Sequence, residues 1–361
     1  MSKPRGNPQL RAVAVAGGIA VICSVAAARQ ASAVSHHATR AQRSLAGSST
    51  DDAAPTWSPD GKKIAFARRE SSHWDVYVVN AGGGGGRALT HGPLDSVDVA
   101  WSPDGKKIAF SRVSGGQEIT GGHVYVMNAD GSGQHQLTSG AGGYDEFFGW
   151  SPDGTKMTFE RIIDGNGAIY VMNTNGSGQQ ELTPSPSDDD YWAVWSPDGK
   201  KIAFDRTGAS AFGDIWMMNA DGSGQRRLTA TSADDFGSAW SPDSKKIAFM
   251  SNRTGRYQVY VMGSGGGPQR RLTHTGADAG EPTWSRDGKQ IAYSSQVGTA
   301  SEIVVADAGG GHQQQLTRGA GDNTAPAWSP DGKKIAFLST RDGGIDIYVM
   351  NADGSGQRKL A

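Results

Sequence analysis

Two sets of charged residues recur at fixed distances from aromatic residues. Carboxylates stand five residues before a recurring tryptophan at Asp52, Asp145, Asp190 and Asp235, or six residues before it at Asp95, Asp278 and Asp322. Arginines stand two residues after a recurring phenylalanine at Arg68, Arg112, Arg161 and Arg206. If strands bring both sets to one rim, these groups can form paired hydrogen bonds, so structural salt bridges are the expected role. The alternative is a charged mouth of a channel that holds a cation or a basic peptide.

Aromatic residues accompany three of these carboxylates. The segments Tyr144-Asp-Glu-Phe-Phe148, Asp188-Asp-Asp-Tyr-Trp192 and Asp234-Asp-Phe236 occupy corresponding places. Aromatic side chains flanked by carboxylates are typical of a protein-binding hot spot or of a platform for sugar rings. The alternative is that these rings pack over a longer loop. The predicted partner-binding residues are Tyr144, Asp145, Phe148, Asp190, Tyr191, Trp192, Asp235 and Phe236.

Other motifs predict no chemistry. Gly82 to Gly86 lacks the following Gly-Lys-Ser/Thr of a phosphate-binding loop. The repeated Asp-Gly-Ser-Gly turns offer one carboxylate each, whereas calcium takes six to eight oxygens. The eight histidines are scattered without metal-ligand spacing, although a ring could unite distant positions. We therefore expect no catalytic residue, metal or cofactor, and the net charge of −1 gives no indication of nucleic-acid binding.

An internal repeat decides the expected fold. The string Trp57-Ser-Pro-Asp-Gly-Lys-Lys-Ile-Ala-Phe66 recurs with small variations at intervals of 44 to 49 residues. This period, built from short strands, is typical of one propeller blade. The sequence predicts an all-β, seven-bladed β-propeller of four-stranded antiparallel blades, with a six-bladed ring plus an extra repeat as the alternative. The predicted structural framework consists of Trp57, Trp101, Trp150, Trp195, Trp240, Trp284 and Trp328.

Each repeat is expected to place its turns and loops on opposite faces of the ring. A strand ends in the tryptophan, Ser-Pro-Asp-Gly turns the chain, and a strand ending in Ile-Ala-Phe follows. After a variable loop come a third strand, such as Ile347–Met350, a second regular turn, and a fourth strand, such as Gln357–Leu360. The loops that vary between repeats would share one face, and we expect binding there.

The N-terminus predicts export. A basic start with Lys3, Arg5 and Arg11 precedes an apolar run and Ala31-Ser-Ala33, which is the pattern of a cleaved signal peptide over residues 1–33. No membrane span is then expected after cleavage, and the localisation is extracytoplasmic, either periplasmic or secreted. The single cysteine, Cys23, lies in this segment. Residues 34–52 form an N-terminal segment, in which Gln42–Leu45 resembles a closing outer strand, and residues 53–361 form the propeller.

The repeat resembles the WD40-like (PD40) repeats of TolB-type propellers. The resemblance covers residues 42–361 and rests on Trp-Ser-Pro-Asp-Gly, Ile-Ala-Phe and Ile-Tyr-Val-Met-Asn. TolB itself is associated with six blades preceded by an α/β domain, whereas only about 20 residues separate the expected cleavage site from the first repeat here. Prolyl-oligopeptidase-like enzymes carry similar repeats beside a hydrolase domain, but this chain contains no Gly-x-Ser-x-Gly.

These features together predict a non-enzymatic scaffold. We expect an exported TolB-like propeller that binds a protein or peptide on the irregular loop face. The alternative is a carbohydrate-binding protein or a propeller-type polysaccharide lyase, in which the loop aromatics would stack on sugar rings. A third possibility is a stable disc that has lost a partner domain.

Overall fold

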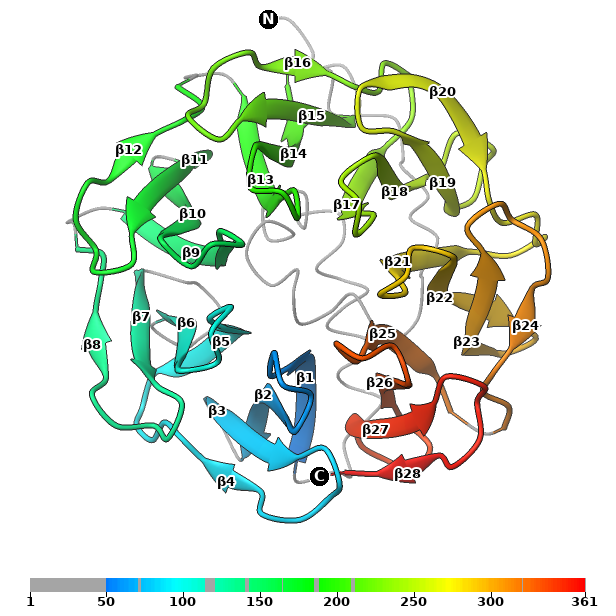
Figure 1. Ribbon diagram of the computed structural model, residues 1–361, viewed down its shortest axis with the longest axis horizontal. Coiled ribbons are helices and arrows are strands. Elements are labelled where there is room, and N and C mark those ends of the chain that lie inside the picture. The colour runs from blue at the N-terminus through cyan, green and yellow to red at the C-terminus, as the bar shows by residue number, and fades with distance from the viewer. Residues whose placement is uncertain are drawn as a thin grey trace, which may run out of the picture.

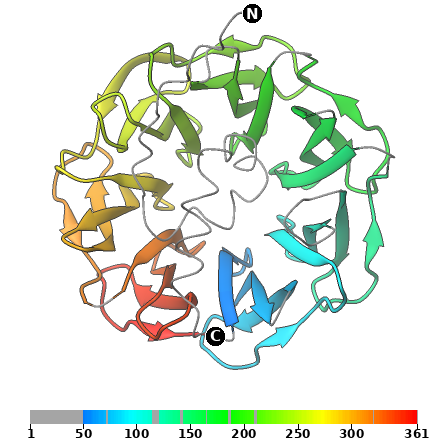
Figure 2. The same cartoon turned by 180° about the vertical axis from the view of Figure 1, so that it is seen from behind.

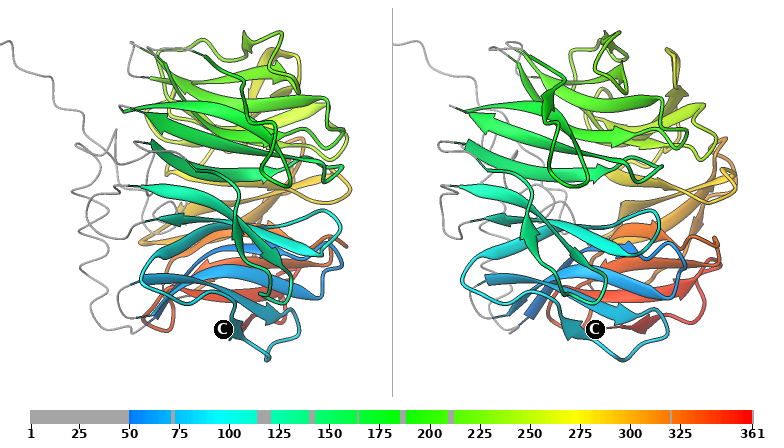
Figure 3. Two further views of the ribbon diagram at one scale, coloured as in Figure 1. Left: turned by 90° about the vertical axis from the view of Figure 1, so that its left-hand side faces the viewer. Right: turned by 60° about the vertical axis from the view of Figure 1, so that its left-hand side comes forward.

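The structure is a computed structural model that describes residues 50–70, 73–113, 121–139, 143–163, 165–184, 188–208, 212–319 and 321–360. These residues form a ring of β-sheets around a central channel (Figure 1). Figure 2 shows the ring from behind, and Figure 3 shows it edge-on, with the strands running between its two faces. The predicted closing strand Gln42–Leu45 lies outside the described residues.

Each of the seven repeats contributes four strands in chain order. The inner strands, which end at the recurring tryptophan, are β1 (Thr50–Trp57), β5 (Asp95–Trp101), β9 (Gly143–Trp150), β13 (Asp189–Trp195), β17 (Asp235–Trp240), β21 (Ala279–Trp284) and β25 (Asn323–Trp328). The second strands are β2 (Lys63–Glu70), β6 (Lys107–Val113), β10 (Lys156–Ile163), β14 (Lys201–Thr207), β18 (Lys246–Ser251), β22 (Gln290–Val297) and β26 (Lys334–Ser339).

The outer half of each repeat follows the same order. The third strands are β3 (His73–Asn80), β7 (Gly122–Asn128), β11 (Asn166–Asn173), β15 (Gly213–Asn219), β19 (Gln258–Gly263), β23 (Ala300–Asp307) and β27 (Asp346–Asn351). The fourth strands are β4 (Arg87–Ala88), β8 (His135–Gln136), β12 (Gln180–Glu181), β16 (Arg226–Arg227), β20 (Gly266–Arg271), β24 (Gln314–Gln315) and β28 (Arg358–Lys359).

The hydrogen bonding confirms an all-β propeller with four-stranded blades but corrects the expected number of blades. Five repeats form separate four-stranded sheets, whereas β5 to β12 form one eight-stranded sheet. The two repeats in that sheet join where β7 pairs with β9 in parallel, at Gly122 and Tyr144. The prediction of seven separate blades is therefore wrong, and the alternative of six blades is wrong as well.

The joining of the second and third repeats into one sheet has a local cause. At the other interfaces between repeats, an aspartate six residues before the tryptophan accepts the backbone N–H that opens the third strand of the preceding repeat, as in Trp74 to Asp95 at 2.8 Å. The third repeat carries Tyr144 at this position instead. Its ring lies where a Cβ on Gly122 would stand, only 2.4 Å from the ring carbon Cδ2. Because glycine has no side chain, the two backbones can approach and pair directly.

The Ser-Pro-Asp-Gly turn explains why the inner and second strands form a hairpin. In the first repeat, the Gly61 N–H donates to the Ser58 carbonyl at 2.8 Å, and Gly61 has a φ of 67°. The Ser58 hydroxyl donates to Asp60 at 2.7 Å and accepts from the Lys63 N–H at 2.9 Å. The hydrogen bonds that Asp60 accepts from the Ser58 hydroxyl and the Lys62 N–H lower its pKa. The face that carries these turns is called the turn face, and the opposite one the loop face.

The ring closes through contacts between the first and last repeats. The Asp52 N–H donates to the Ile345 carbonyl at 2.7 Å, and the Trp57 indole N–H donates to the Ala327 carbonyl at 3.0 Å. A hydrophobic cluster spans the same seam and includes Phe66 and Ile347. β28 pairs with β27 inside the last repeat. Strand β1 begins at Thr50, so it includes the last residues of the segment assigned to 34–52 from the sequence.

The framework tryptophans pack between neighbouring repeats. Trp240 is 8% exposed, contacts a core that includes Ile215 and Leu228 from the preceding repeat, and donates its indole N–H to the Val194 carbonyl at 3.1 Å. We expect Trp240→Ala to lower the free energy of unfolding by roughly 3–5 kcal/mol. Urea unfolding measures this loss, with Lys245→Ala on the adjacent turn as the control. A loss below about 1 kcal/mol would contradict the framework role.

Candidate functional site

The predicted salt bridges are present at the loop-face end of the inner strands. Of the predicted arginines, Arg68 binds Asp52, Arg161 binds Asp145 and Arg206 binds Asp190, at 2.5 to 2.6 Å. Asp235 is bound at 2.9 Å by Arg253, which the sequence pattern did not identify. The carboxylates are at most 2% exposed. Each guanidinium also stacks over rings of its own repeat; that of Arg206 lies 4.6 Å from the centroid of Trp216 and 5.3 Å from that of Phe204. Burial raises the pKa of Asp190, and the Arg206 guanidinium opposes this rise.

The second set of predicted carboxylates links neighbouring repeats. Asp95, Asp278 and Asp322 each accept a backbone N–H from the third strand of the preceding repeat at 2.8 Å. Arg112 differs from the other predicted arginines, because its nearest partner on the inner strand is the Ser96 hydroxyl at 3.5 Å. The repeated charges therefore hold the ring together, and the loop aromatics are left as the candidate binding groups.

Four aromatic side chains from two adjacent repeats come together near the loop face. Tyr191 contacts Trp192 with 5.4 Å between ring centroids, Trp192 contacts Phe236 at 5.8 Å, and Phe236 contacts Tyr257 at 5.3 Å. All four are partly exposed. We call these four residues the aromatic cluster. Tyr257 was missed by the sequence analysis; its only signal is an extra aromatic residue just before the third strand of the fifth repeat.

The other predicted partner-binding residues lie elsewhere. Tyr144 is buried beside β7, and Phe148 packs against the core between the third and fourth repeats. Asp145, Asp190 and Asp235 form ion pairs with Arg161, Arg206 and Arg253, respectively. Of the eight predicted residues, the structure brings Tyr191, Trp192 and Phe236 together in the aromatic cluster.

The backbone at Trp192 is strained. A β-bulge interrupts β13 between Tyr191 and Val194, and Trp192 has a φ of 52°. A positive φ costs about 1–2 kcal/mol for a residue with a side chain, and for a bulky residue it is unusual. The residue at the same place in the next repeat is Gly237, with a φ of 70°. Ala54, Asp98, Glu281 and Ala325 have φ values of 49° to 56° at the same place in four other repeats, so this backbone conformation belongs to the bulge of the repeat and not to the fourth repeat alone.

A group of three carboxyls, two of them buried and one partly exposed, lies in the second and third repeats. Glu146 and Glu160 face each other across β9 and β10, and Asp98 of β5 lies beside them; these three residues form the acid cluster. Burial, together with the charges of Asp98 and Glu160, raises the pKa of Glu146 well above its usual range. Burial also raises the pKa of Asp98 to about 7. The sequence signal for the acid cluster was an acidic residue directly after the strand-ending phenylalanine, as at Glu160.

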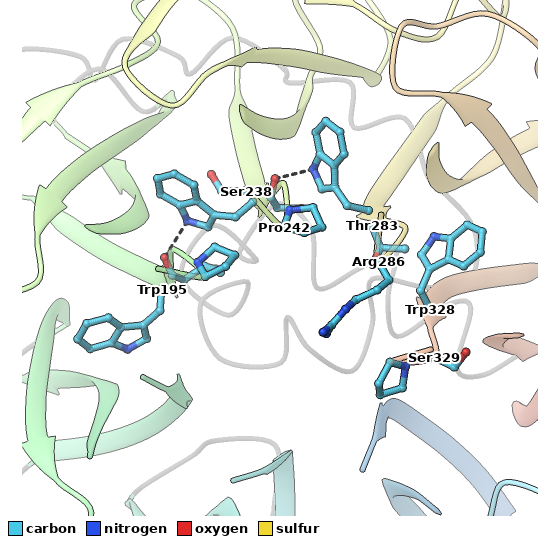
Figure 4. A pocket seen from close by; sticks show the side chains of 13 residues that line it. Trp195, Ser238, Pro242, Thr283, Arg286, Trp328 and Ser329 are labelled. Carbon is cyan, nitrogen blue, oxygen red and sulfur yellow. Dashed lines mark hydrogen bonds between the residues drawn. The ribbon is translucent and has the colours of Figure 1, made fainter. Parts of the chain in front are cut away.

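A cavity of about 860 Å³ opens at the turn-face end of the channel (Figure 4). Four framework tryptophans, three prolines of the turns and Arg286 line its wall. The Arg286 side chain points into the open space, whereas the tryptophan rings lie back against the strands (Figure 4). The sequence analysis placed binding on the opposite face, because it took the repeated turns as purely structural.

Within the described ranges, no group of three or more histidine, cysteine, aspartate or glutamate side chains is arranged to hold a metal ion. In the same part of the chain, no helix has the length and apolar character needed to span a membrane.

Comparison with known structures shows the fold. TolB from Acinetobacter baumannii is 19% identical, with a TM-score of 0.54 and coverage of 82% of this chain and 79% of that chain. Oligogalacturonate lyase from Vibrio parahaemolyticus is 14% identical, with a TM-score of 0.65 and coverage of 82% and 88%. A puromycin-hydrolysing peptidase from Mycobacterium tuberculosis is 14% identical, with a TM-score of 0.69; the match covers 86% of this chain but 53% of the peptidase.

Sequence comparison gives the family. No curated protein matches the chain at a significant level. The family model described as the TolB beta propeller domain matches residues 20–145, 193–301 and 279–361. These segments span most of the chain and include the recurring tryptophans, with the exception of Trp150. The protein therefore belongs to the TolB beta-propeller (PD40) family.

Proposed function

We propose that this protein is an exported scaffold that binds an extended peptide through the aromatic cluster on its loop face. The observation that carries the proposal is the aromatic cluster, in which four partly exposed rings from two adjacent repeats contact one another in turn. Aromatic rings with few rotatable bonds are the usual anchors of peptide and protein partners.

Binding is favoured over catalysis because the carboxylates at the loop-face rim already have partners within the protein. The buried aspartates at the loop-face rim already bind arginines or backbone N–H groups. In the acid cluster, Glu146 is 4% exposed and Glu160 is 1% exposed, whereas Asp98 is partly exposed. Export is supported by the signal-peptide pattern of residues 1–33.

Replacing Trp192 with glycine tests the site, because glycine removes the ring and fits the backbone. Peptides selected from a random library against the unmodified protein would serve as ligands. We expect Trp192→Gly to weaken their binding by about 30-fold, the effect of a hot-spot residue. Ala54→Gly is the matched control, since Ala54 occupies the same bulge position in the first repeat with a φ of 49°. Unchanged binding by Trp192→Gly, or equal losses in both variants, would exclude the site.

The stabilities of two Trp192 variants separate strain from packing. Trp192→Ala and Trp192→Gly lose the same ring contacts, but only glycine accepts the positive φ freely. We expect the glycine variant to be more stable than the alanine variant by about 1 kcal/mol. Chemical denaturation measures the difference. If the alanine variant is the more stable one, the backbone at Trp192 is not strained.

A second candidate function is binding of a glycan. The partly exposed rings of Trp192 and Phe236 offer faces on which sugar rings stack, and one structure of similar fold is an oligogalacturonate lyase. Binding to an oligosaccharide panel that is lost in Trp192→Gly, with no peptide selected, would favour this candidate. Cleavage of a polysaccharide by the purified protein would favour its lyase form instead.

A further inference from the structure

We propose that the turn-face cavity is a second binding site, which takes a small organic anion whose charged group pairs with Arg286. This site lies at the opposite end of the channel from the aromatic cluster and does not depend on the peptide-binding role. Its ligand would combine a carboxylate or phosphate group with an apolar body. The inference rests on the position of Arg286, its lack of partners and the character of the walls.

Arg286 stands where the other turns carry proline. Six turns contain Pro59, Pro103, Pro152, Pro197, Pro242 and Pro330, and the sixth repeat alone reads Ser-Arg-Asp-Gly. Each proline lies close to the turn of the following repeat; for example, Pro242 Cδ is 3.6 Å from the position of a Cβ on Gly288. The Cβ of Arg286 keeps this contact with Gly332 at 3.5 Å. The packing role is therefore met by the base of the side chain, and the guanidinium extends beyond it.

The guanidinium is free to bind a ligand. No hydrogen bond or ion pair joins Arg286 to another of the described residues, whereas the arginines of the loop-face rim bind carboxylates. The adjacent carboxylate of Asp287 is already engaged, because it accepts the Ser285 hydroxyl at 2.8 Å and the Lys289 N–H at 3.1 Å. An arginine with unused donors forms two parallel hydrogen bonds with a carboxylate or phosphate.

The walls of the cavity define the remainder of the ligand. Trp195, Trp240, Trp284 and Trp328 form its sides, and Pro197, Pro242 and Pro330 lie at its rim. Indole and pyrrolidine rings offer apolar contact to a flat or cyclic body. The volume of about 860 Å³ lies within the range of small-molecule sites. Ser238, Thr283 and Ser329 add polar groups to the wall, and a single cation among these groups favours a ligand with one anionic group over a polyanion.

Tryptophan fluorescence gives a direct assay, because four tryptophans line the cavity. The probes are benzoate and phenyl phosphate, with neutral benzamide and inorganic phosphate as comparisons. We expect saturable quenching by benzoate or phenyl phosphate, weaker binding of benzamide and phosphate alone, and a loss of affinity at high salt. The stronger of the two anionic probes identifies the charged group.

Arg286→Pro is the decisive variant, because it restores the proline that six other repeats carry at this turn position and should fold normally. We expect it to weaken binding about 10-fold or more, with an unchanged unfolding midpoint. Lys289→Ala removes an exposed cation from the same turn and should bind within about twofold of the unmodified protein. Arg286→Gln serves as a second variant if the proline variant is less stable. Equal binding by Arg286→Pro, equal losses in both turn variants, or equal affinity for inorganic phosphate and benzoate would overturn the proposal.

Discussion

Replacing Arg206 with methionine is expected to lower the free energy of unfolding by about 3–5 kcal/mol near neutral pH. Methionine keeps apolar contact with Phe204 and Trp216 but leaves the Asp190 carboxylate buried without its cation. Burial would then raise the pKa of Asp190 further, opposed by the hydrogen bond with Thr183 and no longer by the guanidinium. Because this folded-state pKa would lie above the unfolded one, the variant should be most stable in acid and lose stability as pH rises through the raised pKa.

The second repeat supplies a matched control. Arg112 stacks over Phe110 and Tyr125 at 5.3 and 4.8 Å but has the Ser96 hydroxyl where Arg206 has a carboxylate. Arg112→Met should therefore cost only about 1 kcal/mol and show little dependence on pH. Urea unfolding across a pH series distinguishes the two variants. Equal losses at all pH values would mean that stacking, and not the ion pair, stabilises this rim.

Glu146→Gln is expected to stabilise the protein at about pH 8 by on the order of 2 kcal/mol and to have little effect near pH 4.5. In the folded protein, burial and the neighbouring Asp98 and Glu160 raise the pKa of Glu146. A carboxyl whose pKa is higher in the folded protein than in the unfolded chain makes its full contribution to the stability of the protein below the unfolded-state pKa. This contribution is lost as the pH rises through the folded-state pKa. The raised pKa of Asp98, at about 7, places part of this loss between about pH 4 and 7.

The measurement is the free energy of unfolding as a function of pH for the unmodified protein and the variant. Glu302→Gln is the control, because the buried Glu302 carboxylate accepts hydrogen bonds from Thr317 at 2.5 Å and Asn323 at 2.9 Å. That variant should be destabilised across the pH range. If Glu146→Gln is destabilised in the same way, the acid cluster is held by hydrogen bonds and does not retain protons.

The features that every repeat shares could be predicted, because the residues that produce them lie within a single repeat. The last residue of the Ser-Pro-Asp-Gly turn has a positive φ, which favours glycine, as at Gly61, and the fixed spacing of Arg206 and Asp190 places them on adjacent strands. The joining of two repeats into one sheet could not be predicted in this way. It depends on the contact between Gly122 and Tyr144, which belong to different repeats.

The candidate sites were less predictable, because their residues also come together from different repeats. Tyr191, Trp192 and Phe236 were identified from their acidic surroundings, but Tyr257 joins them only through packing between strands. The acid cluster brings Asp98 against Glu146 across an interface, and neither residue breaks a pattern within its own repeat. Arg286 does break the repeat, but its meaning depends on the cavity that the turns surround.

The central claim is that the Trp192 ring, as part of the aromatic cluster, binds a ligand. The most direct test is the Kd of a library-selected peptide for the unmodified protein, Trp192→Gly and Ala54→Gly, measured beside their unfolding midpoints. We predict that only Trp192→Gly loses affinity, by about 30-fold, while it remains folded. If Trp192→Gly binds the peptide as tightly as the unmodified protein, the aromatic cluster is part of the core and the proposed function is wrong.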